Sequence, residues 1–173
     1  EKKDLFVSQV IDDHFIQYTL SKQQRSFISK MVYGVIENQI LLNYYIQTSS
    51  NVKNNKIRPV IRLILQLAIY QLLFLDKVPA HAAINEAVKL VKKRKMFQLR
   101  GFVNGVLRNI ERHHEEIDKK IQSLPIEQRL SITYSMKQEL VNYLLNVYDA
   151  KELESYLNAT MSVKDTCIRT NTM

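Results

Sequence analysis

Glycine, proline and cysteine are scarce in this sequence. Its 173 residues include three glycines, three prolines and a single cysteine. A fold rich in β-turns needs more glycine and proline than this, which excludes an all-β architecture. The lone Cys167 cannot form an internal disulfide, and no Cys/His grouping has the spacing of a zinc site. We therefore expect a reducing, cytoplasmic location and no structural metal.

Long apolar runs and common catalytic motifs are also missing. The most apolar stretch, residues 61–75, is interrupted by polar side chains and is shorter than the roughly 20 residues of a membrane crossing. No glycine-rich phosphate loop, G-x-S-x-G, H-E-x-x-H or C-x-x-C string occurs, and His113 to Glu116 has the wrong spacing for a helical zinc pair. We expect no membrane partner, no catalytic residue and no metal ligand in this chain.

Helical signals dominate the first two thirds of the chain. Ser21 to Gln24 is typical of a capping box and predicts a helix that runs to about residue 47, followed by a polar loop over 48–56. Pro59 suits the first turn of the next helix, predicted over 59–75. This segment is apolar nearly all round, which predicts a position in the middle of a helical bundle. Further helices are predicted over 81–94 and across the segment that holds Phe102 to Ile110.

The three glycines lie inside these helical patterns. Each is expected to destabilise its helix by ~1 kcal/mol relative to alanine, so we predict that a neighbouring helix approaches closely at Gly34 and at the pair Gly101 and Gly105. A loop position ahead of the helix is the alternative for Gly101.

A change of composition after Arg112 predicts a domain boundary. We expect a helical domain over 1–112, a linker over 113–130 and a second helical region over 131–173. Capping signals at Ser135 to Gln138 and at Asp149 to Glu152 predict two helices in that region. The β-prone residues 166–172 predict a C-terminal β-strand. Such a strand needs a partner strand, which the sequence does not supply, and the sequence also lacks an initiating Met. We therefore expect this chain to be a piece of a longer gene product.

Positive charge is concentrated in the middle of the chain. The net charge is 0 over residues 1–52, +10 over 53–112 and −2 over 113–173. Basic residues near the methionine and phenylalanine at 96 and 97 suit single-stranded RNA, since phosphates can meet the charges and unstacked bases can meet a ring. The candidate RNA-binding residues are Lys89, Lys92, Lys93, Arg94, Lys95, Arg100, Asn104, Arg108 and Arg112. Stabilisation of a helix end by cations and a merely solvated face are the alternatives.

Three strings carry a resemblance to a known family. These are Val32–Val35 (VYGV), the segment from Arg58 through Asp76–Val88 (DKVPAHAAINEAV), and Gly101–Asn109 (GFVNGVLRN). Together they make residues 5–112 similar to the NusB-like all-helical RNA-binding fold. The expected fold class is therefore all-α, a NusB-like bundle followed by a short helical linker region and the C-terminal β-strand.

Two groups share that fold: stand-alone NusB antitermination factors and the N-terminal domain of 16S rRNA cytosine-C5 methyltransferases of the RsmB (Sun or Fmu) type. The segment 72–83 and the continuation beyond residue 112 resemble the methyltransferases more closely. The resemblance implies that this region recruits and orients rRNA for a catalytic domain that uses S-adenosylmethionine. It implies no cofactor and no activity in this fragment, because the family's two catalytic cysteines lie outside the matched region and Cys167 matches neither.

The implied partners are a single-stranded or looped region of 16S rRNA, small-subunit ribosomal proteins and the protein's own catalytic domain. Two other functions stay open. One is a stand-alone antitermination or ribosome-assembly factor. The other is a structural domain whose basic face docks the acidic linker or the catalytic domain, which would make the charge intramolecular.

Overall fold

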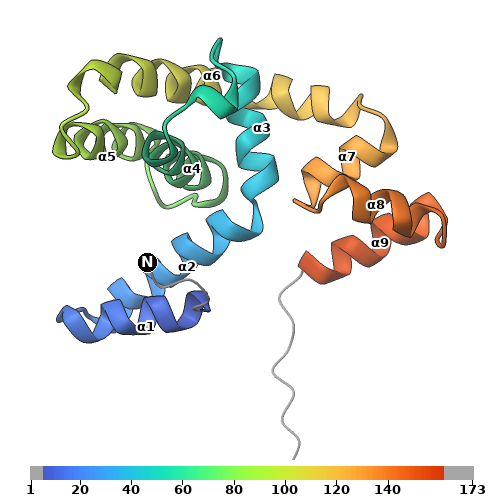
Figure 1. Cartoon of the computed structure of the whole chain (residues 1–173), viewed down its shortest axis with the longest axis horizontal. Helices are drawn as coiled ribbons and strands as arrows, with labels where there is room; N and C mark the ends of the chain where they lie inside the picture. The colour runs from blue at the N-terminus through green and yellow to red at the C-terminus, as the bar shows by residue number, and fades with distance from the viewer. Residues whose placement is uncertain (1–5, 162–173) are drawn as a thin grey trace, which may run out of the picture. The chain divides into compact units, whose positions relative to one another are not determined.

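The structure is a computed structural model that describes residues 6–161. The chain divides into two compact units, residues 1–117 and 118–173. Within residues 6–161 every regular element is a helix (Figure 1). The helical part of the predicted fold class fits, but the C-terminal β-strand is wrong: the described chain contains no strand, and residues 166–172 lie outside it. None of the described helices is long and apolar enough to cross a membrane.

The first unit is organised around α4 (Pro59–Phe74), which packs against α2 (Lys22–Glu37), α3 (Gln39–Ser49) and α5 (Ala80–Lys93) (Figure 1). Pro59 begins α4, as predicted, because its missing N–H would have no partner in the first turn. Seven residues of α4 are buried, which confirms its central position. The unit also contains α1 (Val7–Gln17), two short 3₁₀ turns, η1 (Asn54–Lys56) and η2 (Phe97–Leu99), and the first part of α6 (Arg100–Gln122).

The helix predicted from residue 21 to 47 is broken in two. Its start is confirmed: Ser21 and Gln24 form the reciprocal capping box, with N–H to side-chain oxygen distances of 2.9 and 3.2 Å. The break is at the buried Asn38, whose backbone leaves the helical region at φ −105° and ψ 20°. The Asn38 side-chain amide donates to the Gly34 carbonyl at 2.8 Å. An asparagine side chain that bonds the backbone in this way competes with helix continuation.

The close approach predicted at the glycines is found at Gly34 and not at Gly101 and Gly105. A Cβ on Gly34 would lie 2.0 Å from Cζ of Tyr70, so α4 does approach α2 closely there. Gly101 and Gly105 are exposed, and a Cβ on either would meet nothing within 4 Å. The expected close approach at these two positions is therefore wrong.

The second unit is built from α7 (Ile126–Thr133), α8 (Gln138–Leu145) and α9 (Ala150–Met161). Its core consists of the fully buried residues Leu130, Val141, Leu153 and Leu157. Asp149 caps α9 as predicted, by accepting from the Lys151 N–H at 3.2 Å. The capping box predicted from Ser135 is wrong. Ser135 has φ 49° and ends α7, and α8 follows Lys137 without a side-chain cap.

The predicted domain boundaries stay a prediction. In the structure the region 113–130 holds the end of α6 and the beginning of α7. The backbone of α6 leaves helical geometry at His113, where φ is −123° and ψ is 16°.

Candidate nucleic-acid interface

The predicted basic residues of α5 lie on its exposed side. The buried side of this amphipathic helix consists of Ala83, Ile84, Ala87 and Val91, which face the core. Lys89, Lys92 and Lys93 are exposed. Lys89 is bound to Glu86, one turn earlier, at 2.7 Å, so part of its charge is neutralised within the helix.

The end of α5 projects two further cations. Arg94 closes the helix, and Lys95 takes a left-handed backbone conformation with φ 58°. Two backbone bonds fix this turn: Lys95 N–H donates to the Lys92 carbonyl at 2.9 Å, and Met96 N–H donates to the Val91 carbonyl at 3.1 Å. This pairing is a Schellman motif, in which glycine is the usual left-handed residue. Here the position holds an exposed lysine.

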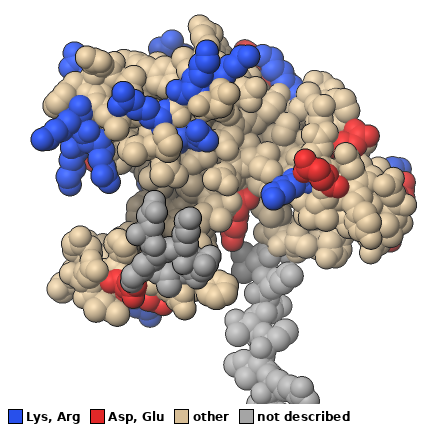
Figure 2. All heavy atoms as spheres, viewed as in Figure 1, with Lys and Arg blue, Asp and Glu red and all other residues tan. Residues whose placement is uncertain are grey.

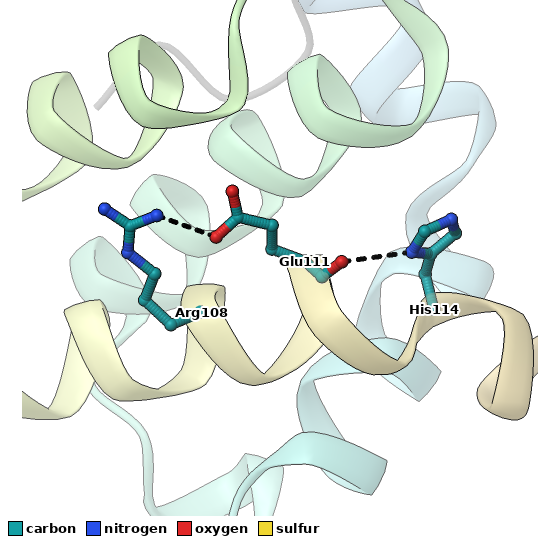
Figure 3. Close-up of polar contacts among 3 residues, drawn as sticks. All are labelled: Arg108, Glu111 and His114. Carbon is teal, nitrogen blue, oxygen red and sulfur yellow. Dashed lines mark hydrogen bonds and ion pairs between the residues drawn. The ribbon is translucent and has the colours of Figure 1, made fainter.

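The polar stripe predicted on α6 is present. Arg100, Asn104 and Arg112 are exposed, while Val103, Leu107 and Ile110 pack into the core. Arg108 is half-buried and donates to the Glu111 carboxylate at 2.8 Å (Figure 3). The Glu111 carbonyl lies 3.3 Å from Nδ1 of His114 on the following turn. Arg108 therefore has less charge to offer a ligand than the exposed Arg100 and Arg112 of the same helix.

The predicted cations other than Lys89 and Arg108, together with Arg58 just before α4, form what we call the basic surface, which consists of Arg58, Lys92, Lys93, Arg94, Lys95, Arg100 and Arg112. Figure 2 shows Lys and Arg side chains gathered over the end of α5 and continuing along α6. None of Lys92 to Lys95 has an ion pair with any residue of the described chain. A cluster of unpaired, exposed cations attracts a polyanion.

Two cations near this surface, Arg58 and Lys56, are not among the residues predicted from the sequence. Arg58 immediately precedes α4 and lines one hollow of about 350 Å³ together with Lys95, Met96 and Phe97. Arg58 and Lys56 line an adjoining hollow of about 240 Å³ with Phe102. The signal available in the sequence was the high positive charge of the whole segment 53–112, which includes the loop before α4. Only the fold brings that loop beside the end of α5.

A larger hollow of about 530 Å³ lies between α1 and α2. Its lining is almost entirely apolar, with His14 and Tyr18 as the two titratable side chains among the described residues that form it. A polyanion gains nothing from such a surface, so the candidate interface remains at the basic surface. Among residues 6–161 no group of His, Cys, Asp and Glu is arranged to hold a metal ion.

Known proteins match the two units of the chain to different extents. The NusB family matches residues 1–112. Over 107 residues the chain is 37% identical to "Transcription antitermination protein NusB" of Bacillus velezensis, covering 61% of this chain and 82% of that protein. Over 154 residues it is 33% identical to "Probable ribosomal RNA small subunit methyltransferase B" of Bacillus subtilis, covering 89% of this chain and 34% of that protein.

A protein of the same name from Synechocystis is 32% identical over 165 residues, which are 94% of this chain and 36% of that protein. The chain thus spans about a third of the length of these methyltransferase relatives. With residues 1–112 matched and a close antitermination relative covered over most of its length, the chain belongs to the NusB family.

Proposed function

We propose that this chain is the rRNA-binding region of a 16S rRNA cytosine-C5 methyltransferase that acts in the cytoplasm. Its role is to recruit a single-stranded or looped rRNA segment through the basic surface and to orient it for a catalytic domain. Phosphates are bound by the exposed cations of α5 and α6, which give affinity with little sequence preference.

The extent of the similarity supports the methyltransferase assignment. The antitermination relative is matched over 107 residues, about the length of the NusB domain. The matches of 154 and 165 residues are longer than that domain and must include much of the second unit. A helical region shared with the methyltransferases beyond the NusB domain favours them over a stand-alone factor. The substantial coverage of the antitermination relative keeps that factor as the second candidate.

The cofactor belongs elsewhere in such a protein. S-adenosylmethionine carries a positively charged sulfonium and an ammonium group. The hollows beside the basic surface are lined by cations and uncharged side chains, with no carboxylate among the described residues that form them. These residues do not fit the cofactor, so we assign methyl transfer to the remaining two thirds of the relatives' length. Small-subunit ribosomal proteins and the catalytic domain itself are further proposed partners.

Salt-dependent RNA binding tests the proposal. On a single strand, log affinity falls with log salt by ~0.7 for each phosphate neutralised. Replacing Lys92, Lys93, Arg94 and Lys95 together by glutamine should lower this slope by about 2 to 3 and weaken binding on the order of 100-fold at low salt. Fluorescence anisotropy with a labelled single-stranded rRNA fragment measures both quantities.

A matched control removes the same number of charges from the second unit. The exposed residues Lys119, Lys120, Lys137 and Lys151 changed to glutamine should leave affinity and slope near their original values. Arg100→Gln should lower the slope more than Arg108→Gln, because Glu111 already neutralises Arg108. If the folded four-residue variant at the end of α5 binds like the original chain, the basic surface is not the RNA-binding face. In that case an intramolecular role for the charge is favoured.

The full-length protein gives the test of the methyltransferase assignment. The same four substitutions at the end of α5 should raise KM for rRNA and leave kcat nearly unchanged, because they remove binding that is uniform along the reaction. A full-length protein that does not methylate 16S rRNA under conditions where it binds RNA would favour the antitermination or assembly factor.

A further inference from the structure

The two adjoining hollows beside the basic surface share part of their lining. Both are lined by Arg58 and Leu99. The larger is completed by the connection between α5 and α6, including Lys95, Phe97 and Gln98. We propose that these hollows form one site that binds one unstacked base of a single-stranded RNA, with the base stacked on the Phe97 ring and its flanking phosphates on Arg58 and Lys95. This inference rests on the proposed RNA-binding function and assigns it a specific site.

Phe97 is the main reason for choosing a nucleobase. Its side chain is 56% exposed although it is a large apolar ring, and it lines the hollow together with two exposed cations, Arg58 and Lys95. Every base has a π-face that can stack on such a ring whatever its identity. Gln98 lines the same hollow, and its amide can both donate to and accept from the polar edge of a base.

The charges around the hollows select an anionic ligand. Lys56, Arg58 and Lys95 contribute to the lining, and no acidic residue of the described chain does. A neutral flat ligand would use the ring but gain nothing from three cations, and a cationic ligand would be repelled. A base flanked by phosphates uses both the ring and the charges.

Hydrogen bonds hold the rim in place without a ligand. In the loop before α4, the Asn54 side-chain amide donates to the Asn43 carbonyl of α3 at 2.9 Å. The Arg62 guanidinium donates to the Ile57 carbonyl at 3.3 Å, next to Arg58. On the other side, the Schellman motif fixes Lys95 and Met96. A site already ordered in this way loses less conformational entropy on binding.

Tryptophan fluorescence offers a direct test, because the chain contains no tryptophan. In Phe97→Trp the new ring should be quenched when a single-stranded oligouridylate of about 12 nucleotides binds. Free uridine monophosphate at the same nucleotide concentration should leave the emission unchanged, because it lacks the neighbouring phosphate contacts. Equal quenching by the free nucleotide would overturn the assignment to RNA and identify a mononucleotide site.

Two further variants, made in the original chain without the tryptophan, separate the stacking of a base from the apolar volume of the side chain. Phe97→Ala should weaken binding to the oligouridylate by about 5- to 150-fold, the loss equivalent to stacking one base. Phe97→Leu retains apolar bulk without a π-face and should also bind clearly more weakly than the original chain. The salt slope should stay unchanged in both, because the phosphate contacts remain. Tyr143→Ala, which removes a 65% exposed ring from the second unit, is the control and should bind normally.

The outcomes distinguish this inference from the function on which it rests. If Phe97→Ala and Phe97→Leu bind with the original affinity, and the fluorescence of Phe97→Trp is not quenched by the oligouridylate, the proposed base site is wrong. The RNA-binding proposal still stands in that case, provided that the four-charge variant at the end of α5 loses affinity. If the original chain shows no salt-dependent RNA binding, both proposals fail together.

Discussion

The two units use their charged residues differently. Residues 1–117 contain eighteen basic and ten acidic residues, a net charge of +8, whereas residues 118–173 contain seven of each. In the second unit Arg129 of α7 makes a bidentate ion pair with Glu154 of α9, at 2.5 and 2.9 Å. In the first unit Lys92 to Lys95 have no such partner within the described chain.

This difference indicates what each set of charges does. A bidentate Arg–carboxylate pair between two helices fixes their relative position, so the charges of the second unit contribute to its fold. Exposed cations that crowd together repel one another and add little to stability. The RNA-binding role proposed above would account for their concentration at the end of α5, and stabilisation of the helix end by cations is the alternative. The predictions below test this contrast, beginning with the largest expected effect.

The cores of the two units differ in size, which gives the largest prediction. Leu153 and Leu107 are both fully buried, but among residues 6–161 the core cluster around Leu153 has only four fully buried members. Leu153→Ala should lower the free energy of unfolding of the second unit by about 3 kcal/mol. The backbone amides of that unit should then exchange rapidly with solvent, while those of α4 stay protected from exchange. Leu107→Ala should lose a similar amount without loss of either fold. Hydrogen exchange that rises equally in both units after Leu153→Ala would show that they do not fold independently.

The glycines of the first unit provide the next test. Gly34→Ala would place a methyl group against Tyr70, which is buried and stacked on Phe74 with ring centroids 5.0 Å apart. The ring cannot move aside without losing this stacking, so we expect a net loss of about 2 kcal/mol in urea unfolding. Gly105→Ala is the matched control. It meets no neighbour and should stabilise α6 by about 0.5–1 kcal/mol. Equal effects at the two positions would remove the argument for close packing at Gly34.

Sequence patterns predicted the helices better than their interruptions. The capping box at Ser21 and the proline at the start of α4 are local signals, and both are confirmed. The break at Asn38 has no such signal, because asparagine is tolerated inside helices and interrupts one only where its side chain bonds the backbone. The prediction at Ser135 was wrong because a serine three residues before a helix can instead belong to the turn that follows the preceding helix, as Ser135 does after α7.

The candidate site was predictable only where it is local in sequence. The cations at the end of α5 and the stripe on α6 follow from charge and spacing. Their ion pairs do not, since Arg108 could have pointed to solvent and instead meets Glu111. Arg58 joins the candidate site because the fold brings it into the lining of the same hollow as Lys95, although the two residues are 37 positions apart in the sequence. That the nine predicted residues bind RNA stays a prediction.

The ion pair of the second unit predicts a pH effect. The hydrogen bond from Arg129 holds the pKa of the Glu154 carboxyl below its usual 4.5. A lowered pKa in the folded state means that the pair stabilises the unit fully above about pH 4.5 and loses this contribution as the pH falls through the lowered pKa. Glu154→Gln should cost about 1 kcal/mol at pH 7, since both side chains are partly exposed.

The two proteins should then converge in stability as the pH falls below 4, measured by urea unfolding at each pH. Glu111→Gln is the control from the first unit. Its pair with Arg108 joins residues of one helix and should contribute at most a few tenths of a kcal/mol. A difference between Glu154→Gln and the original chain that persists unchanged in acid would mean that the pair is not the source of the stabilisation.

The smallest effect separates binding from folding at one residue. Lys95 occupies a left-handed position at φ 58°, where a side chain is strained and glycine is not. Lys95→Gly should therefore raise the free energy of unfolding by about 0.5 kcal/mol, because relief of strain outweighs the greater freedom of glycine in the unfolded chain. The same change should lower the salt slope of RNA binding by ~0.7, the contribution of one phosphate contact.

Lys95→Gln removes the same charge and keeps the strain, so it should lower the salt slope equally without stabilising the protein. If the lysine instead served the dipole of α5, both variants would lose stability and bind RNA as before. A stabilised Lys95→Gly chain that binds RNA more weakly is the outcome that only a functional lysine at this turn explains. It would mean that the lysine at this left-handed position lowers the stability of the protein relative to glycine and contributes a contact to the RNA.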